Sequence, residues 1–148
     1  MKLISACLLG IRCAWDGKDR YRNDKAIELL RSETLIPICP EQPGVLKTPR
    51  ASQEIQGGTG EDVLNGICKV LNSNGQDVTG EFVRGAGETL NIARQFDIKE
   101  FIAKSRSPSA MLFFIVLFLV LLKFLNGDGV TTALLKRNGI RIIGEEDL

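Results

Sequence analysis

Two short apolar stretches decide the fold: MKLISACLLG at residues 1–10 and TLIPIC at residues 34–39. Each is an almost continuous apolar run, which is typical of a strand buried on both faces of a sheet. Between them, Asn23 precedes apolar residues at helical spacing, and asparagine is a favoured residue at a helix N-cap. We therefore expect a strand over residues 3–9, a helix that begins after Asn23, and a second strand over residues 34–39.

The same alternation of strand and helix patterns continues to the C-terminus. Residues 40–60 contain several prolines and glycines and show no apolar period, so we expect a long ordered loop there. The remaining expected elements are a strand over 67–71 with Val78 as a short hairpin partner, helices capped by Thr79 and by Asp128, and strands over 98–103 and 140–143. Strands that alternate with helices predict one α/β domain over residues 1–148, with an open, mostly parallel sheet and flanking helices in a Rossmann-like, three-layer arrangement.

The helix expected from Thr79 has the clearest period in the sequence. The residues predicted on its buried face are Phe82, Ala86, Leu90, Ala93 and Phe96. Gly85 and Gly87 also lie within this helix, where each costs about 1 kcal/mol relative to alanine. Their presence predicts close packing of the helix against a neighbouring segment.

The charge balance and the lack of histidine limit the possible functions. The chain has 148 residues, with 19 lysine and arginine residues against 18 aspartate and glutamate residues, and a formal net charge of +1. Such a balance argues against a nucleic-acid-binding protein that neutralises phosphates. Because the sequence contains no histidine, Ser-His-Asp and Cys-His nucleophile pairs and imidazole metal sites are excluded. Acid–base chemistry would have to come from carboxylates, cysteines, lysines or Tyr21.

Neither secretion nor a membrane span is predicted from the apolar segments. The apolar start is shorter than a secretory signal, and the charged residues Asp16 and Lys18 follow it closely. Residues 110–122 are continuously apolar, but this run is shorter than the roughly 20 residues of a transmembrane helix, and Lys123 interrupts it. We expect a cytoplasmic protein with an anomalous apolar segment over residues 110–126, acting on a small molecule and not on membranes or nucleic acid.

The cysteines are the residues best suited to carry chemistry. In a reducing compartment Cys7, Cys13, Cys39 and Cys68 are expected to be free, catalytic or metal-bound and not to form a disulfide framework. Cys7 and Cys39 accompany the carboxyl ends of the two expected strands, which can be neighbours in a parallel sheet, and ligands gather at that edge. Thiolates without histidine suit an iron–sulfur cluster or a soft metal. Buried, reduced cysteines of the core are the alternative.

Several motifs, in order along the chain, resemble one family. They are Ser5-Ala6-Cys7-Leu8-Leu9-Gly10 with Cys13 and Asp16-Gly17, Pro37-Ile38-Cys39-Pro40-Glu41-Gln42 with Thr48-Pro49-Arg50, Gly60-Glu61-Asp62-Val63, Asp77-Val78-Thr79, Ser107-Pro108-Ser109 and Gly127-Asp128-Gly129-Val130-Thr131. Together they resemble the bacterial thiouracil desulfidase family, long catalogued as a domain of unknown function. The resemblance covers nearly the whole chain apart from residues 110–126.

The resemblance implies an α/β domain that holds a 4Fe-4S cluster by three cysteines and leaves one iron open to the sulfur of a thiocarbonyl compound such as thiouracil. By motif, Cys7 and Cys39 are the expected ligands, and Cys13 is a spare ligand or a structural thiol. Glu41 is the candidate acid or base, with a solvated loop carboxylate as the alternative. The further candidates are Ser107 and Ser109 for proton transfer and Asp16, Arg50, Asp128 and Thr131 for binding an anion or a polar substrate edge, with capping and turn formation as the alternative.

This chain departs from the family pattern after Ser109. The family continues with Cys-Gly and a glycine-rich stretch, whereas this chain has Ala110, Met111 and then the apolar segment. The interval to Gly127 keeps the family's length, which indicates replacement and not insertion. The third ligand that the resemblance implies is therefore missing, and the alternative function is a non-catalytic α/β domain that binds a small ligand or a metal. Cys68, in the expected hairpin, is predicted to be part of the core.

Overall fold

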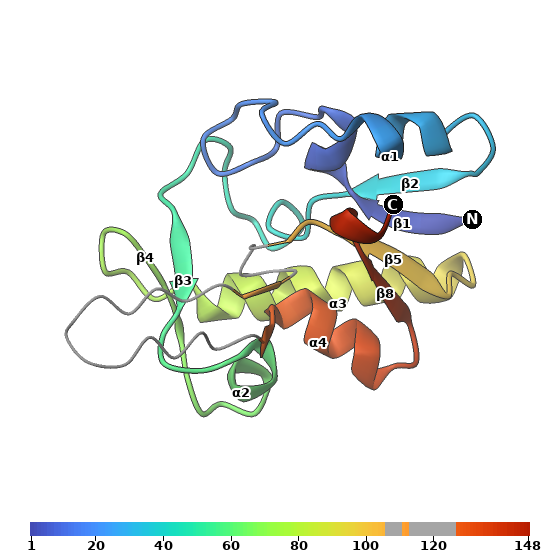
Figure 1. Ribbon diagram of the computed structural model, residues 1–148. Helices are drawn as coiled ribbons and strands as arrows, with labels where there is room; N and C mark the ends of the chain where they lie inside the picture. Colours follow the sequence, from blue (N-terminus) through green and yellow to red (C-terminus); the bar gives the residue numbers. More distant parts are fainter. Residues whose placement is uncertain (106–110, 113–126) are drawn as a thin grey trace, which may run out of the picture.

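Four parallel strands form the central sheet. The structure, a computed structural model, describes residues 1–105, 111–112 and 127–148. The strands are β1 (Lys2–Ser5), β2 (Leu35–Ile38), β5 (Glu100–Ala103) and β8 (Arg141–Gly144). Their order across the sheet is β2-β1-β5-β8 (Figure 1). Every pairing in this sheet is parallel, which confirms the predicted open parallel sheet.

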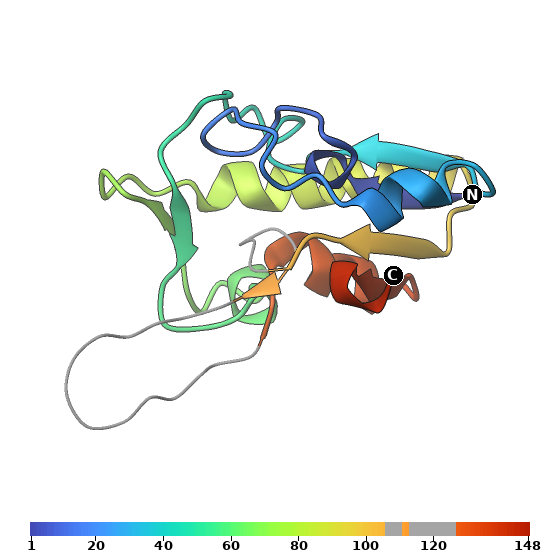
Figure 2. The same cartoon turned by 45° about the horizontal axis from the view of Figure 1, so that its top comes forward.

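Helices cover both faces of this sheet (Figures 1 and 2). They are α1 (Asp24–Leu29) on one face, and α3 (Thr79–Gln95) and α4 (Val130–Arg137) on the other. Successive side chains of a strand point to opposite faces. Ile4 of β1 accordingly packs in one cluster with Ala26 of α1. Its neighbour Leu3 packs with Leu90 of α3 and Leu135 of α4. The predicted three-layer arrangement is thereby confirmed.

Smaller elements lie around this sheet, and the hairpin β3–β4 lies beyond the carboxyl ends of its strands, at the left in Figures 1 and 2. They are η1 (Ala6–Leu9), α2 (Gly60–Leu64), the antiparallel pair β3 (Gln53–Ile55) and β4 (Val70–Asn72), the antiparallel pair β6 (Met111–Leu112) and β7 (Gly127–Asp128), and η2 (Glu145–Asp147). The anomalous segment 110–126 lies outside the described residues apart from β6. In the described ranges no helix has the length and apolar character needed to cross a membrane.

β1 ends at Ser5, so the strand predicted over residues 3–9 is too long. The following residues, Ala6–Leu9, form the 3-10 turn η1. Gly10 closes this turn with a φ of 82° and donates its N–H to the carbonyls of Ala6 and Cys7. Glycine adopts such a positive φ at little cost. Cys7 therefore lies within a turn at the carboxyl end of β1 and not in the strand itself.

The long loop predicted over residues 40–60 is wrong in part, because β3 and the beginning of α2 lie within it. The strand predicted over residues 67–71 begins only at Val70, and it pairs with β3. The predicted return of Val78 is confirmed by its N–H, which donates to the Val70 carbonyl at 2.9 Å. α2 begins with a capping box between Thr59 and Asp62. The sequence signal for this missed helix is Thr-x-x-Asp.

Of the three side chains predicted to cap helices, one caps its helix and two do not. Asn23 caps α1 as predicted, accepting the N–H groups of Lys25 and Ala26. Thr79 is the first residue of α3 instead of its cap, and its hydroxyl oxygen accepts the Val70 N–H at 2.9 Å. Asp128 lies in β7, and its carboxylate binds Lys136 at 2.8 Å. These two predicted caps are wrong because each side chain has a partner outside the helix start.

The buried face of α3 is correct for four of its five predicted residues. Phe82, Ala86, Leu90 and Ala93 are buried. Phe96 follows the last helical residue and is 55% exposed. The next residue, Asp97, adopts a positive φ of 50°, so the chain turns away and Phe96 does not continue the buried face.

Candidate functional site

Parallel pairing brings two cysteine-bearing loops to the same edge of the sheet. β1 pairs with β2 so that Ser5 is opposite Ile38, and the chain continues from these residues to Cys7 and Cys39. The predicted proximity of these strand ends is confirmed. Ser5, which the sequence reasoning missed, is 5% exposed, and its hydroxyl oxygen accepts the Lys104 N–H at 3.0 Å. This contact ties the end of β5 to the same edge, and a lone polar residue at the end of an apolar strand is its sequence signal.

Three of the four cysteines lie together at this edge. Cys13 is 1% exposed and Cys39 is 8% exposed, and both pack in one small cluster with Ala6 and with the partly buried Cys7. The Sγ atom of Cys39 lies 3.5 Å from the carbonyl oxygen of Cys13. The structure therefore brings Cys13 into the group that the sequence predicts around Cys7 and Cys39.

The surroundings of Cys13 and Cys39 favour the protonated forms of these two thiols. The Cys39 thiol lowers the pKa of Cys13. The Cys7 thiol, burial and the charge of Glu41 raise it by more, so that the pKa is raised overall to about 12. The pKa of Cys39 is raised by the Cys13 thiol, by burial and by the Glu41 carboxylate. In the absence of a metal, Cys13 and Cys39 are neutral thiols at neutral pH.

The donor set matches an iron–sulfur centre in chemistry. Fe–S clusters are held by cysteine thiolates, and three thiols meet here without a histidine. Their present placement is that of free thiols that contact one another. Among the residues that the structure describes, no three Cys, His, Asp or Glu side chains surround a common point as the ligands of a single metal ion do. The site thus supplies suitable ligands, and they are not arranged around one ion.

Glu41 is buried directly beside the cysteines. It is 7% exposed, and its Oε2 atom accepts a hydrogen bond from Cys39 Sγ at 3.1 Å. The turn that carries it is closed by the Gln42 N–H, which donates to the Cys39 carbonyl at 3.0 Å. The alternative of a solvated loop carboxylate is wrong for this residue. A carboxylate shielded from water and in contact with the Cys39 thiol is placed to exchange protons with it.

Helix α3 supports the turn that carries Glu41. A Cβ atom at Gly85 of α3 would lie 2.0 Å from the Pro40 carbonyl oxygen, and one at Gly44 would lie 2.2 Å from the Glu81 carbonyl oxygen. The backbones of the turn and the helix therefore touch, which confirms the close packing predicted at Gly85. A Cβ atom at Gly87 would meet no other described segment within 4 Å, so the same prediction is wrong there.

Arg50 joins the two cysteine-bearing loops from within. Its side chain is 8% exposed. Its Nη1 atom donates to the carbonyl of Cys13 and to the hydroxyl of Thr48, each at 3.1 Å. Its Nη2 atom lies 3.7 Å from Glu41 Oε2. Its Nε atom is buried and has no hydrogen-bond partner among the described residues, so that part of the structure leaves a buried cationic donor available to a ligand.

The other predicted site residues are not all part of this group. The carboxylate of Asp16 accepts the Lys18 N–H at 3.1 Å and pairs with Arg20 at 2.9 Å, which is turn chemistry. Thr131, in the first turn of α4, is 1% exposed, and within residues 1–105, 111–112 and 127–148 its hydroxyl has no hydrogen-bond partner. Ser107 and Ser109 lie outside the described residues, as does Ala110.

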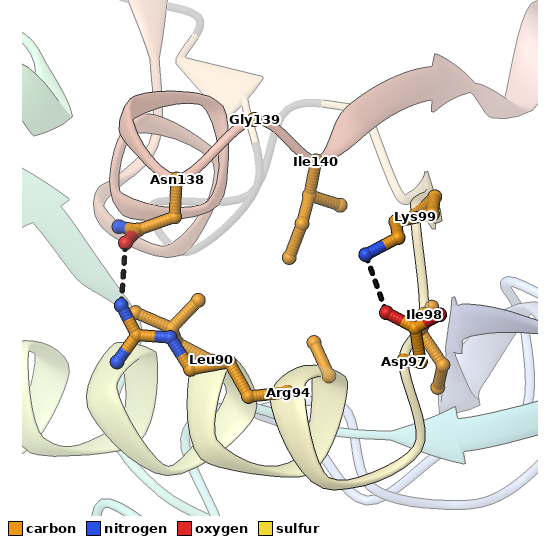
Figure 3. A pocket seen from close by; sticks show the side chains of 9 residues that line it. Leu90, Arg94, Asp97, Ile98, Lys99, Asn138, Gly139 and Ile140 are labelled. Carbon is orange, nitrogen blue, oxygen red and sulfur yellow. Dashed lines mark hydrogen bonds and ion pairs between the residues drawn. The ribbon is translucent and has the colours of Figure 1, made fainter.

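A cavity at the opposite edge of the sheet does not contain these residues (Figure 3). It has a volume of about 200 Å³ and lies where α3 and α4 end and where β5 and β8 begin. On its rim Arg94 donates to Asn138 at 2.7 Å, and Lys99 pairs with Asp97. In open α/β sheets, ligands bind at the carboxyl ends of the strands, so the cysteine-bearing edge is the candidate site.

Comparison with known proteins gives consistent results over the whole chain. The sequence model of the 2-thiouracil desulfurase family matches residues 3–147. The chain is 41% identical over 148 residues to the uncharacterized protein YbbK of Bacillus subtilis (strain 168), which covers 100% of this chain and 97% of YbbK. The solved structure of the 4Fe-4S-dependent thiouracil desulfidase TudS superposes with a TM-score of 0.80 and 33% sequence identity, over 99% of this chain and 91% of TudS. The chain therefore belongs to the 2-thiouracil desulfurase family.

Proposed function

We propose that this protein removes sulfur from thiouracil or a similar small thiocarbonyl compound. Membership of the family and the likeness to a thiouracil desulfidase support this proposal. The observation that carries it is the meeting of Cys7, Cys13 and Cys39 with the buried carboxylate of Glu41 at the ligand-binding edge of the sheet. The net reaction is a hydrolysis, in which water supplies the oxygen of the carbonyl product and the sulfur leaves as hydrogen sulfide, so no external oxidant or reductant is needed.

Cys7 and Cys39 are the residues that we assign as ligands of a 4Fe-4S cluster. They follow adjacent parallel strands, and their loops are held together by the sheet register. When bound, such a cluster supplies an iron to which the sulfur of the substrate attaches. The family's cysteine at position 110 is absent from this chain, which has Ala110 there.

Glu41 is the residue that we assign to proton transfer. Its Oε2 atom faces the Cys39 thiol, and its burial keeps bulk water from competing for the proton. In the proposed reaction Oε2 accepts a proton from the attacking water. The Nη2 atom of Arg50 lies 3.7 Å from this oxygen, which places a guanidinium beside the carboxylate. Ser107 and Ser109 remain proposed partners in proton transfer.

Two residues keep a proposed role in holding the substrate. The Nε atom of Arg50 and the hydroxyl of Thr131 are buried polar groups that find no hydrogen-bond partner in the part of the chain that the structure describes. A carbonyl oxygen or an anionic edge of a pyrimidine would satisfy such donors. Asp16 and Asp128 already pair with Arg20 and Lys136, and we assign them no substrate contact. The free state of all four cysteines suits the reducing cytoplasm, where we place the protein.

The proposal is tested with anaerobically reconstituted protein and thiouracil. We expect release of uracil and sulfide in equal amounts. Glu41→Gln keeps the shape of the side chain but cannot accept the proton, so turnover should fall by about 10²-fold or more. Glu54→Gln, on the exposed surface of β3, is the matched control. Cluster-loaded protein that releases neither product would contradict the function, and an unimpaired Glu41→Gln variant would contradict the role of Glu41.

Release of neither product would favour the alternative of a non-catalytic domain. The absence of the family's cysteine at position 110 is the observation that favours this alternative. Uracil formation distinguishes the two functions, because a binding domain would retain its metal or ligand without forming uracil.

A further inference from the structure

We infer that Cys13 is the third cluster ligand in this chain and takes the place of the cysteine that the family resemblance implies at position 110. The inference rests on the proposed function in one respect, since it assumes the same kind of cluster. It concerns a residue that the motif alone leaves as either a ligand or a structural thiol.

The supply of thiols in the chain restricts the choice. The sequence has four cysteines and no histidine, and cysteine thiolates are the ligands that hold such clusters. Cys68 belongs to a different part of the fold, where it packs against the core cluster that contains Ile55 and Val63, with its Sγ atom 3.7 Å from the Thr59 carbonyl oxygen. Cys13 is thus the cysteine that remains to accompany Cys7 and Cys39.

The position of Cys13 is fixed by the same contacts that build the site. Its N–H donates to the Ile11 carbonyl at 2.8 Å, and its carbonyl accepts from Arg50 Nη1 at 3.1 Å. Its side chain packs in the cluster that contains Cys39 and Cys7. A purely structural thiol would need only to fill apolar space, whereas this one is 1% exposed in a cluster that contains two other thiols, close to a buried carboxylate and a buried guanidinium.

Three thiolates on four irons leave one iron without a protein ligand, which is the vacancy that the proposed reaction needs. Arg50 donates to the Cys13 carbonyl and lies beside Glu41, so its side chain ties the loop of Cys13 to the turn that follows Cys39. On this inference Cys7, Cys13 and Cys39 supply the three thiolates, and no residue of the segment 110–126 is needed as a ligand.

The test is the iron and acid-labile sulfide content of anaerobically reconstituted variants, with a visible spectrum. The wild-type chain should hold about four of each. Cys13→Ser and Cys13→Ala should lose most of both, as should Cys39→Ala, whereas Cys68→Ala should keep the wild-type content. Serine nearly preserves the size of cysteine, and circular dichroism of the apo variants shows whether each chain is folded.

The outcomes separate this inference from the proposed function. A folded Cys13→Ser variant that keeps the full iron and sulfide content would overturn the assignment of Cys13, whatever its activity. A wild-type chain that takes up no iron would also overturn it. Wild-type protein that holds the cluster, loses it on the Cys13 substitutions, and releases no uracil would support Cys13 as a ligand while the proposed reaction fails.

Discussion

Alanine substitution at Gly85 and at Gly87 should change the stability of the same helix in opposite directions. A Cβ atom at Gly85 would lie 2.0 Å from the Pro40 carbonyl oxygen, whereas real Cβ contacts stay beyond 3.0 Å. The atom that it meets is backbone and cannot rotate away, so the turn or the helix must move by about 1 Å. Gly87 meets no atom within 4 Å, and alanine there changes only the helix propensity.

The two effects differ enough to measure. Overpacking costs about 1–3 kcal/mol, and the upper end applies to a backbone contact. The better helix propensity of alanine offsets about 1 kcal/mol of this cost. Gly85→Ala should therefore lower the free energy of unfolding by about 2 kcal/mol, and Gly87→Ala should raise it by up to about 1 kcal/mol.

Urea unfolding of the reduced apo protein, followed by circular dichroism, measures both changes. Because Pro40 lies between Cys39 and Glu41, the movement that Gly85→Ala forces should also displace the site and reduce iron uptake, while Gly87→Ala should leave it unchanged. If Gly85→Ala proved as stable as Gly87→Ala and bound as much iron, then α3 would not support the Cys39–Glu41 turn in the way described.

Two further predictions concern the smaller elements. Thr59→Ala removes one half of the α2 capping box, and the free energy of unfolding should fall by about 1 kcal/mol; an unchanged urea midpoint would contradict this. Hydrogen bonds from the hydroxyl and N–H of Thr79, and the ion pair with Lys69, lower the pKa of Asp77 to about 2 from 3.8. Because the folded state holds this carboxylate charged, its contribution is present above pH 3.8 and is lost as the pH falls toward 2. Asp77→Asn should thus lose less stability than wild type over that interval in acid titrations of the urea midpoint, and parallel losses would refute the argument.

Much of the fold can be predicted from the sequence because the apolar residues of the main strands and helices follow clear patterns. Leu3 and Ile4 lie in an apolar run and pack on opposite faces of the sheet, which is the consequence of burial on both sides. α2 and β3 escape such reasoning because they are only five and three residues long and carry no full period. The caps expected from Thr79 and Asp128 are wrong because these side chains bind other residues. The Thr79 hydroxyl accepts the Val70 N–H, and the Asp128 carboxylate binds the Lys136 side chain.

The sequence predicts the positions of site residues only where the pairing of the strands determines them. The proximity of Cys7 and Cys39 follows from parallel pairing of the strands that precede them. The place of Cys13 depends on the path of a loop, which no periodic pattern specifies. The burial of Glu41 depends on α3, because the Pro40 turn can approach that helix only where Gly85 has no side chain.

The buried charges of the site indicate why such an arrangement is kept. Arg50 and Glu41 have side chains that are 8% and 9% exposed, and removing an ion from water costs several kcal/mol. Backbone carbonyls and the Thr48 hydroxyl satisfy the Nη1 atom of Arg50, but its Nε atom remains without a partner. An apolar pair of similar volume is often at least as stable as a buried ion pair, so stability alone does not explain this one. A carboxylate beside the thiol of Cys39, with a guanidinium N–H that has no partner among the described residues, is instead what the proposed site needs if it is to take a proton from water and hold a polar substrate.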